Sequence, residues 1–278
     1  MKNILKVMFG FLNLIFLSGC TESSPLISDE DLVVVWGFVY ANKPITDIKL
    51  TKTLALDADS SSEFSIINDA QVTVVVNENR FECDYAGDEI GYYQYLDNDL
   101  VINSGDKTSI EIEWQGQIIT AESTVPNPPG ELNLESNVME IPNFNDFQSL
   151  LDWRFSENRE IIVNWNQESE DDWFYVVLKN LESNPTPINI NTNFSERMRE
   201  IIFPPVQDNI YRIRLPLIEF LGLHEIRVYR VNREYVDLYD SREQDTRDLN
   251  EPLTNIEGGL GVYSAFNSST INMTVIQN

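Results

Sequence analysis

Leu32-Val33-Val34-Val35-Trp36-Gly37-Phe38-Val39-Tyr40 has the composition of a β-strand. β-Branched and aromatic side chains suit an extended, pleated backbone, and this stretch contains little else. Asn42-Lys43-Pro44 follows directly, and the proline cannot donate a backbone hydrogen bond to a sheet. We therefore expect the folded part of the chain to begin with a strand at residue 32.

Further segments of the same kind follow before residue 125. They are Ile48–Leu56, Val72–Val76, Arg80–Tyr85, Tyr92–Leu96, Ser109–Trp114 and Gln117–Thr124. Turn-forming residues separate them, as in Asn103-Ser104-Gly105-Asp106. Short strands at this spacing, without a long helical period, predict an antiparallel β-sandwich domain over residues 32–125.

Val125-Pro126-Asn127-Pro128-Pro129-Gly130 has the character of a boundary. Prolines at this density are excluded from a central strand and make a semi-rigid spacer. We expect a linker over residues 126–130 and a second domain over residues 131–278.

The second domain also shows strand patterns. Glu160–Trp165 and Trp173–Leu178 form a pair that is similar to the core of a fibronectin type III-like sandwich, and His224–Val231 alternates polar with apolar residues. Short helices are expected after Asn145-Asp146 and from Glu234. The predicted fold class is all-β, with two Ig-like or fibronectin III-like antiparallel β-sandwich domains and minor helices.

The N-terminal residues have the pattern of a bacterial lipoprotein leader. Lys2 and Lys6 precede the apolar run Val7–Leu17, which is too short to cross a bilayer as an anchor. Leu17-Ser18-Gly19-Cys20 then places two small residues before a cysteine. We predict a signal peptide over residues 1–19, lipidation of Cys20 and a polar tether over residues 20–31. The alternatives are an ordinary signal peptide with a cysteine at this position and an uncleaved membrane helix.

Composition limits the partners of the chain. The formal net charge is −26, and removal of a leader carrying Lys2 and Lys6 makes it more negative. Such a surface repels phosphate backbones, so nucleic acid is excluded as a partner. With Cys20 lipidated, Cys83 is left without a disulfide partner. Its place in an alternating segment predicts a buried, unreactive thiol.

Several motifs together resemble one known family. The C-terminal run from Asn250 to Ala265 contains Asn255-Ile256-Glu257-Gly258-Gly259-Leu260-Gly261, and the first domain contains Val35-x-Gly37-x-Val39 and Ala121-x-Ser123-Thr124-Val125-Pro126. These features are similar to the lipoprotein family known as domain of unknown function 4249. The resemblance implies a lipid-anchored outer-membrane protein of Bacteroidota type, often encoded beside TonB-dependent transporters. It supplies no catalytic residues.

The candidates for chemistry are few. No helix and no Lys-Ser/Thr pair follows Gly258-Gly259-x-Gly261, so a tight turn is favoured over a phosphate site. His224 is the sole histidine, which predicts a surface or hydrogen-bonded side chain and not a general base. Acidic loops with Asp57, Asp59 and Glu63, and from Glu168 to Asp172, lack the spacing of a strong calcium motif. We expect no catalytic residues, no metal and no cofactor.

Three functions stay open. The first is a non-catalytic binding or accessory subunit of an envelope complex such as a TonB-dependent transporter, exposed on the cell surface and lipid-anchored in the outer membrane. The second is a glycan- or nutrient-binding lipoprotein, for which Tyr92, Tyr93 and Tyr95 with Trp114, or Trp173 with Tyr175, could supply rings. The third is a carboxylate-dependent hydrolase. We expect the first, with the turn from Asn255 to Ala265 facing the partner. The alternative is that this turn merely closes the sandwich.

Overall fold

The computed structural model describes residues 32–53, 65–87, 91–144, 146–154, 160–188, 198–214, 217–242 and 254–278. They belong to one compact unit from Leu32 to Asn278. The predicted leader, Cys20, the tether and the loop with Asp57, Asp59 and Glu63 lie outside the described residues.

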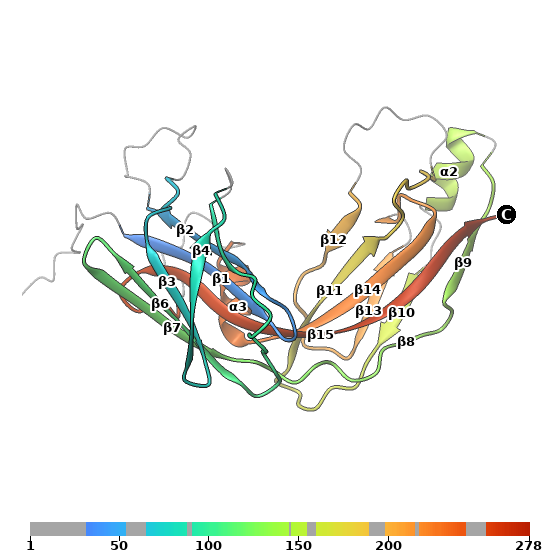
Figure 1. The fold of residues 1–278 in the computed structure, drawn as a ribbon. Coiled ribbons are helices and arrows are strands. Elements are labelled where there is room, and N and C mark those ends of the chain that lie inside the picture. The colour runs from blue at the N-terminus through green and yellow to red at the C-terminus, as the bar shows by residue number, and fades with distance from the viewer. Residues whose placement is uncertain are drawn as a thin grey trace, which may run out of the picture. The chain divides into compact units, whose positions relative to one another are not determined.

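The described elements are strands and two short helices (Figure 1). The strands are β1 (Val33–Tyr40), β2 (Ile45–Lys52), β3 (Gln71–Val76), β4 (Asn79–Tyr85), β5 (Tyr92–Tyr95), β6 (Lys107–Trp114), β7 (Gln117–Thr124), β8 (Asn133–Leu134), β9 (Val138–Ile141), β10 (Glu160–Asn164), β11 (Trp173–Asn180), β12 (Glu200–Ile202), β13 (Ile210–Arg214), β14 (Gly222–Val231) and β15 (Leu260–Gln277). The helices are α2 (Phe147–Arg154) and α3 (Arg233–Arg242). The all-β prediction is confirmed.

Most of the strands form one twelve-stranded sheet. Its order is β12-β11-β14-β15-β1-β2-β5-β4-β3-β6-β7, and β9 pairs with β15. A three-stranded sheet, β13-β10-β8, packs with it. Among the described strands, β15 pairs in parallel with β1 and with β9, whereas the other ladders are antiparallel. The predicted antiparallel sandwich therefore contains two parallel pairings.

The first hydrophobic core lies inside the sandwich that begins with β1. Val33, Val35 and Val39 are fully buried in it, while the alternate residues of β1 are half-buried on the opposite face. This is the period-2 alternation of a strand with one face in the core. Strands β3 and β6 complete this core with residues such as Val74 and Ile110.

The second core lies between β11, β14 and β15 and the three-stranded sheet. Trp165, next to β10, packs on Phe174 of β11 with a ring-centroid distance of 5.2 Å. Val176 and Val228 are fully buried beside them. Tyr175, in the strand segment that the sequence pairs with Glu160–Trp165, lies on the opposite face of β11.

Strand β15 belongs to both cores. Residues 260–266 pair with β1, and residues 267–275 pair with β14. Ile256, Tyr263 and Ala265 are buried in the first core, although the sequence division at residues 126–130 assigns them to the second domain. Proline density indicates where the chain leaves one sandwich, but it carries no signal that a distant strand returns to it.

The helix α2 begins as the sequence predicts. The Ser149 N–H donates to Asp146 Oδ1 over 2.7 Å, so Asp146 caps the first turn. The hydrogen bonds from Ser149 lower the pKa of the Asp146 carboxyl. The helix α3 carries an ion pair between Arg233 and Asp237, one turn apart.

Candidate functional site

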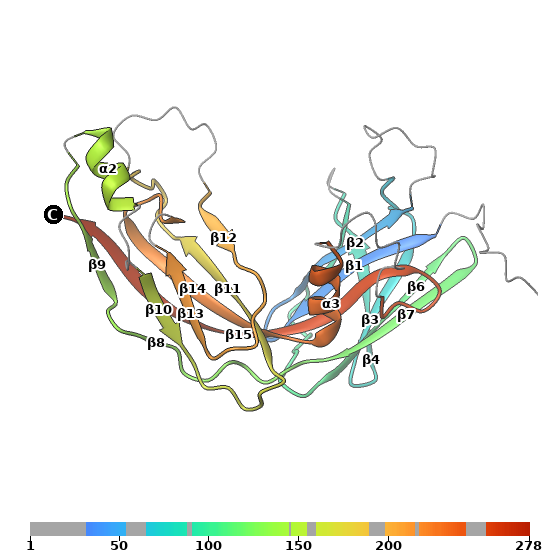
Figure 2. The same cartoon turned by 180° about the vertical axis from the view of Figure 1, so that it is seen from behind.

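A cluster of aromatic rings covers the face of the large sheet that points away from both cores. We call it the aromatic face. The rings come from β1, β11, β14, β15 and α3, and the residues are Trp36, Phe38, Tyr40, Trp173, Tyr175, Tyr229, Tyr235 and Phe266. Helix α3 lies against this side of β15 (Figure 2). The cluster therefore buries apolar side chains outside the two cores, and it leaves Trp36 and Tyr229 half-buried.

The inner rings of this face are tightly packed. Phe266 is 1% exposed and meets Phe38 and Tyr235 edge to face, at centroid distances of 5.6 and 5.1 Å. Tyr175 and Tyr229 stack at 4.7 Å with an interplanar angle of 14°. Both arrangements are favourable for aromatic pairs. The buried rings hold the half-buried Tyr229 in a fixed position.

Charged groups border the rings. The Tyr40 hydroxyl donates to Asp47 Oδ2 over 2.9 Å. Burial raises the pKa of the Asp47 carboxyl, against the lowering effect of that hydrogen bond. Arg227 pairs with Glu225 at 2.8 Å, and its guanidinium carbon lies 5.9 Å from the centre of the Tyr229 ring. The rim of the aromatic face is thus polar and carries both signs of charge.

A groove on β1, β2 and β5 shares Trp36 and Phe38 with the aromatic face. Its volume is about 350 Å³, and its lining residues are Val34, Trp36, Phe38, Asp47, Lys49, Thr51 and Tyr92. The register places Trp36 opposite Lys49, and Lys49 opposite Tyr92. Among the lining residues Asp47 is the one carboxylate. The described lining residues do not bring together the pair of acids that a hydrolase of the glycosidase kind needs.

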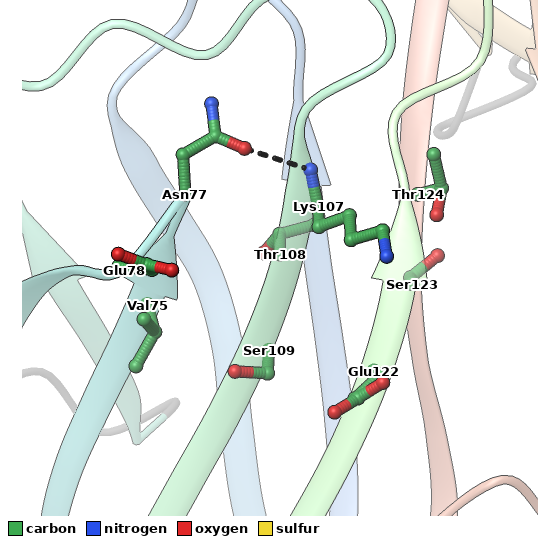
Figure 3. A pocket seen from close by; sticks show the side chains of 9 residues that line it. All are labelled: Val75, Asn77, Glu78, Lys107, Thr108, Ser109, Glu122, Ser123 and Thr124. Atoms are coloured by element: carbon green, nitrogen blue, oxygen red, sulfur yellow. Dashed lines mark hydrogen bonds between the residues drawn. The ribbon is translucent and has the colours of Figure 1, made fainter.

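A second, more polar groove of about 590 Å³ lies on β3, β6 and β7 (Figure 3). Its wall includes Lys107 and the carboxylates of Glu78 and Glu122. The Lys107 backbone N–H donates to Asn77 Oδ1 over 3.2 Å. No aromatic ring lines this groove within the described part of the chain. The aromatic face carries the rings that this groove lacks, and we take it as the candidate site.

The glycine-rich turn is built into the first sandwich. The backbones of Glu257 and Thr120 exchange two hydrogen bonds of 2.8 and 3.0 Å, which join the turn to β7. Gly258 and Gly259 then reverse the chain into β15, and the Asn255 side chain bonds both the N–H and the C=O of Tyr263. The turn closes the sandwich between β7 and β15.

The close approach of backbones explains the glycines. A Cβ on Gly258 would lie 2.5 Å from the Ile118 carbonyl oxygen, and one on Gly259 would lie 2.8 Å from that of Val33. At Gly261 the nearest atom would be the Val35 carbonyl oxygen at 2.0 Å. These glycines contact the chain's own strands, which favours the closing role over a partner-facing one.

His224 and Cys83 are both buried, as expected of residues with a structural role. His224 is 3% exposed, its Nδ1 lies 3.0 Å from the Gly222 carbonyl oxygen, and its Nε2 lies 3.2 Å from Asn180 Nδ2. Burial lowers its pKa, which keeps the ring neutral. Cys83 is buried, and burial raises the pKa of its thiol to about 12. The predicted burial of Cys83 is confirmed, and the raised pKa disfavours the reactive thiolate.

One arginine pairs with two of the four carboxylates in the acidic loop from Glu168 to Asp172. Arg230 pairs with Glu168 at 2.7 Å and with Asp172 at 2.5 Å. The other oxygen of Asp172 accepts the N–H groups of Glu168 and Ser169. In the described part of the chain, no three acidic, histidine or cysteine side chains gather as metal ligands.

Comparison with protein families gives one match. A family model described as "Domain of unknown function (DUF4249)" matches residues 21–272. The chain belongs to this family. The search of curated proteins gives no match.

Two solved structures are similar to this DUF4249 chain at low identity. One is the crystal structure of domains A168–A170 from titin, with 8% identity and a TM-score of 0.22, covering 88% of this chain and 66% of that one. The other concerns host cell surface retention of a 1.5-MDa bacterial ice-binding adhesin, with 12% identity and a TM-score of 0.22, covering 90% and 65%. The chain thus spans just under two thirds of each. TM-scores of this size do not establish a shared fold.

The aromatic residues proposed from the sequence are only partly brought together. Tyr93 and Trp114 are buried in the first core of the DUF4249 chain. Tyr92 lines the groove, while Trp173 and Tyr175 lie on the aromatic face. The Tyr95 hydroxyl instead donates to Asp99.

The sequence did not identify Trp36, Phe38, Tyr40 and Tyr229 as members of an aromatic cluster outside the two cores. The available signal is that β1 is apolar at every position of both faces. A strand with one solvent-exposed face alternates apolar with polar residues. The lack of this alternation in β1 indicates that both of its faces are at least partly covered.

No helix in the described residues is long and apolar enough to cross a membrane.

Proposed function

We propose that this DUF4249 protein is a non-catalytic binding or accessory subunit, anchored in the outer membrane of a Bacteroidota-type cell by a lipid on Cys20. Its partner is an outer-membrane protein such as a TonB-dependent transporter, and the folded part faces the cell surface. The sequence Leu17-Ser18-Gly19-Cys20 supports the anchor. The family resemblance supports the location and the kind of partner.

The observation that carries the binding role is the half-buried Tyr229 with Arg227 beside it on the aromatic face. A few residues carry most of the binding energy at protein interfaces, and tyrosine, tryptophan and arginine are enriched among them. Here Trp36, Tyr229 and Arg227 occupy one sheet face with a polar rim, and the side chain of Arg227 is 23% exposed. An apolar centre with a polar rim is the usual anatomy of a binding surface.

The lipid anchor is tested by Cys20→Ala. This variant is expected to lose acylation completely, because the thiol is the atom that the diacylglycerol group alkylates. Metabolic labelling with a fatty-acid probe measures the loss, and fractionation should show uncleaved precursor or unanchored protein. Cys83→Ala is the matched control and should label like the wild type. Continued labelling of Cys20→Ala would refute the anchor.

The docking surface is tested by the double variant Arg227→Ala/Tyr229→Ala. We expect it to lower recovery of the outer-membrane partner by about tenfold or more, since truncating two such anchors removes on the order of 2 kcal/mol or more. The measurement is quantitative mass spectrometry after cross-linking of intact cells and capture of the lipidated protein. Phe147→Ala is the matched control, because Phe147 is 58% exposed on α2, away from the aromatic face.

The melting temperature separates lost binding from lost folding in this comparison. Tyr229 stacks on Tyr175, so Tyr229→Phe serves as a second variant that keeps the stacked ring. Equal recovery of one partner by the wild type and by a folded double variant would show that the aromatic face is not the docking surface.

A further inference from the structure

The groove beside the aromatic face has an apolar floor on one strand. Val34, Trp36 and Phe38 project from β1 on the side opposite the first core, and each is half-buried. The neighbouring strand β2 supplies Asp47, Lys49 and Thr51. Cross-strand pairing sets Val34 against Thr51, Trp36 against Lys49, and Phe38 against Asp47. Each apolar side chain thus has a polar neighbour on the next strand.

Two aromatic side chains flank the polar strand. Trp36 lies on β1 and Tyr92 on β5, with Lys49 of β2 between them in register. Neighbouring strands are separated by about 4.8 Å, so the two residues lie roughly 10 Å apart across the sheet. Two aromatic side chains at this separation suit an extended ligand made of successive rings with apolar faces.

The polar groups of the groove suit hydroxyls. Tyr40 donates to Asp47 Oδ2 and holds this carboxylate in place. Among the described residues, Asp47 Oδ1 is left to accept a hydrogen bond from a ligand. The Lys49 ammonium group, two residues further along the same face of β2, can donate hydrogen bonds to a ligand. Asp47 and Lys49 also cancel in charge, so the groove itself favours neither a cation nor an anion.

We propose that the groove lined by Trp36, Asp47, Lys49 and Tyr92 binds a neutral oligosaccharide, with sugar rings over the two aromatic side chains and hydroxyls bonded to Asp47 and Lys49. Sugar rings have apolar C–H faces and hydroxyl edges, which match this alternation of rings and polar groups. The volume of about 350 Å³ suits a short segment of such a chain. The net charge of −26 opposes anionic glycans. This inference rests on the proposed role as a non-catalytic binding protein.

The test is calorimetric titration of the lipidated full chain with neutral hexasaccharides. The probes are maltohexaose, cellohexaose, xylohexaose, laminarihexaose and mannohexaose, and the detergent must lack a sugar headgroup so that it does not compete. Tri-galacturonate is the anionic comparison. We expect at least one neutral probe to bind and the anionic probe not to bind.

Variants locate the site. Trp36→Ala is expected to weaken binding of that probe by about tenfold or more through loss of one stacking surface. Asp47→Asn keeps the shape of the side chain and should weaken it severalfold. Trp36→Phe keeps a ring and should retain part of the affinity if Trp36→Ala proves unstable. Phe147→Ala is the matched control and should bind as the wild type does.

Three outcomes would overturn this proposal: no binding of any of the five neutral probes, binding of the anionic probe alone, or unchanged binding by a folded Trp36→Ala variant. Partner capture is a separate readout. Saccharide binding without partner capture would refute the proposed docking role and leave the groove assignment standing. Partner capture without saccharide binding would refute the groove assignment alone.

Discussion

Residues 32–125, produced as a separate fragment, are expected to be unfolded. The fragment lacks the seven residues of β15 that pair with β1, which include the core residues Tyr263 and Ala265, and it also lacks the core residue Ile256. Losing one large core side chain costs about 2–5 kcal/mol, and a whole domain is stable by only about 5–15 kcal/mol. Far-UV circular dichroism and urea titration of the fragment would measure this.

Adding the missing strand in trans is the matched experiment. A peptide of residues 254–278 carries both the turn and β15, and it should restore a cooperative unfolding transition by strand complementation. A peptide with Gly261→Ala is the control and should not restore the transition.

Cleavage of the full chain at residues 126–130 should leave the two pieces associated. A cooperative transition of the isolated fragment would contradict the shared strand.

Gly261→Ala is expected to destabilise the chain by about 4 kcal/mol or more, which is the range of severe core substitutions. The added Cβ would lie 2.0 Å from the Val35 carbonyl oxygen and 2.8 Å from its nitrogen. Both atoms are backbone in a paired strand, so neither can rotate away. The φ of +104° adds strain for any other residue. Equilibrium unfolding in urea would measure the loss.

Gly105→Ala separates strain from collision. Gly105 has a φ of +82°, but a Cβ there would meet nothing within 4 Å. Its substitution should cost only about 1 kcal/mol, the usual penalty of a left-handed backbone. If both substitutions shifted the urea midpoint equally, the close approach of β15 to β1 would not be the reason for Gly261.

The local elements were predictable because their signals are local. The β-branched run from Val33, the cap at Asp146 and the alternating segment around Cys83 each depend on a few neighbouring residues, and each lies as expected. The turn residues Gly258 and Gly259 were also identified as a turn from composition.

The pairing of distant segments was not predictable in this way. The polar stretch from Asn267 to Asn272 shows a weak strand signal, yet it continues β15 from the first core to the second. The parallel pairing of residues 260–266 with β1 joins segments more than 200 residues apart in the sequence. Neither segment contains a local pattern that identifies the other as its partner.

The location of the candidate site depends on the same missing information. Trp36, Phe38 and Tyr40 alternate with core valines, and alternation alone does not say which side of β1 is the core. Only the position of β11, β14 and α3 shows that these rings gather with Tyr175 and Tyr229 on a face outside both cores.

The parallel pairing of β1 with β15 also determines how the chain responds to mechanical force. Suppose that residue 32, where the chain enters β1, and Asn278, at the end of β15, are pulled apart. In parallel strands this tension acts along the ladder, so the hydrogen bonds between residues 34–40 and 260–266 share the load at once. Shear of this kind resists rupture better than sequential unzipping. A protein tethered at its N-terminus and gripped near its C-terminus would therefore keep its first sandwich closed under tension.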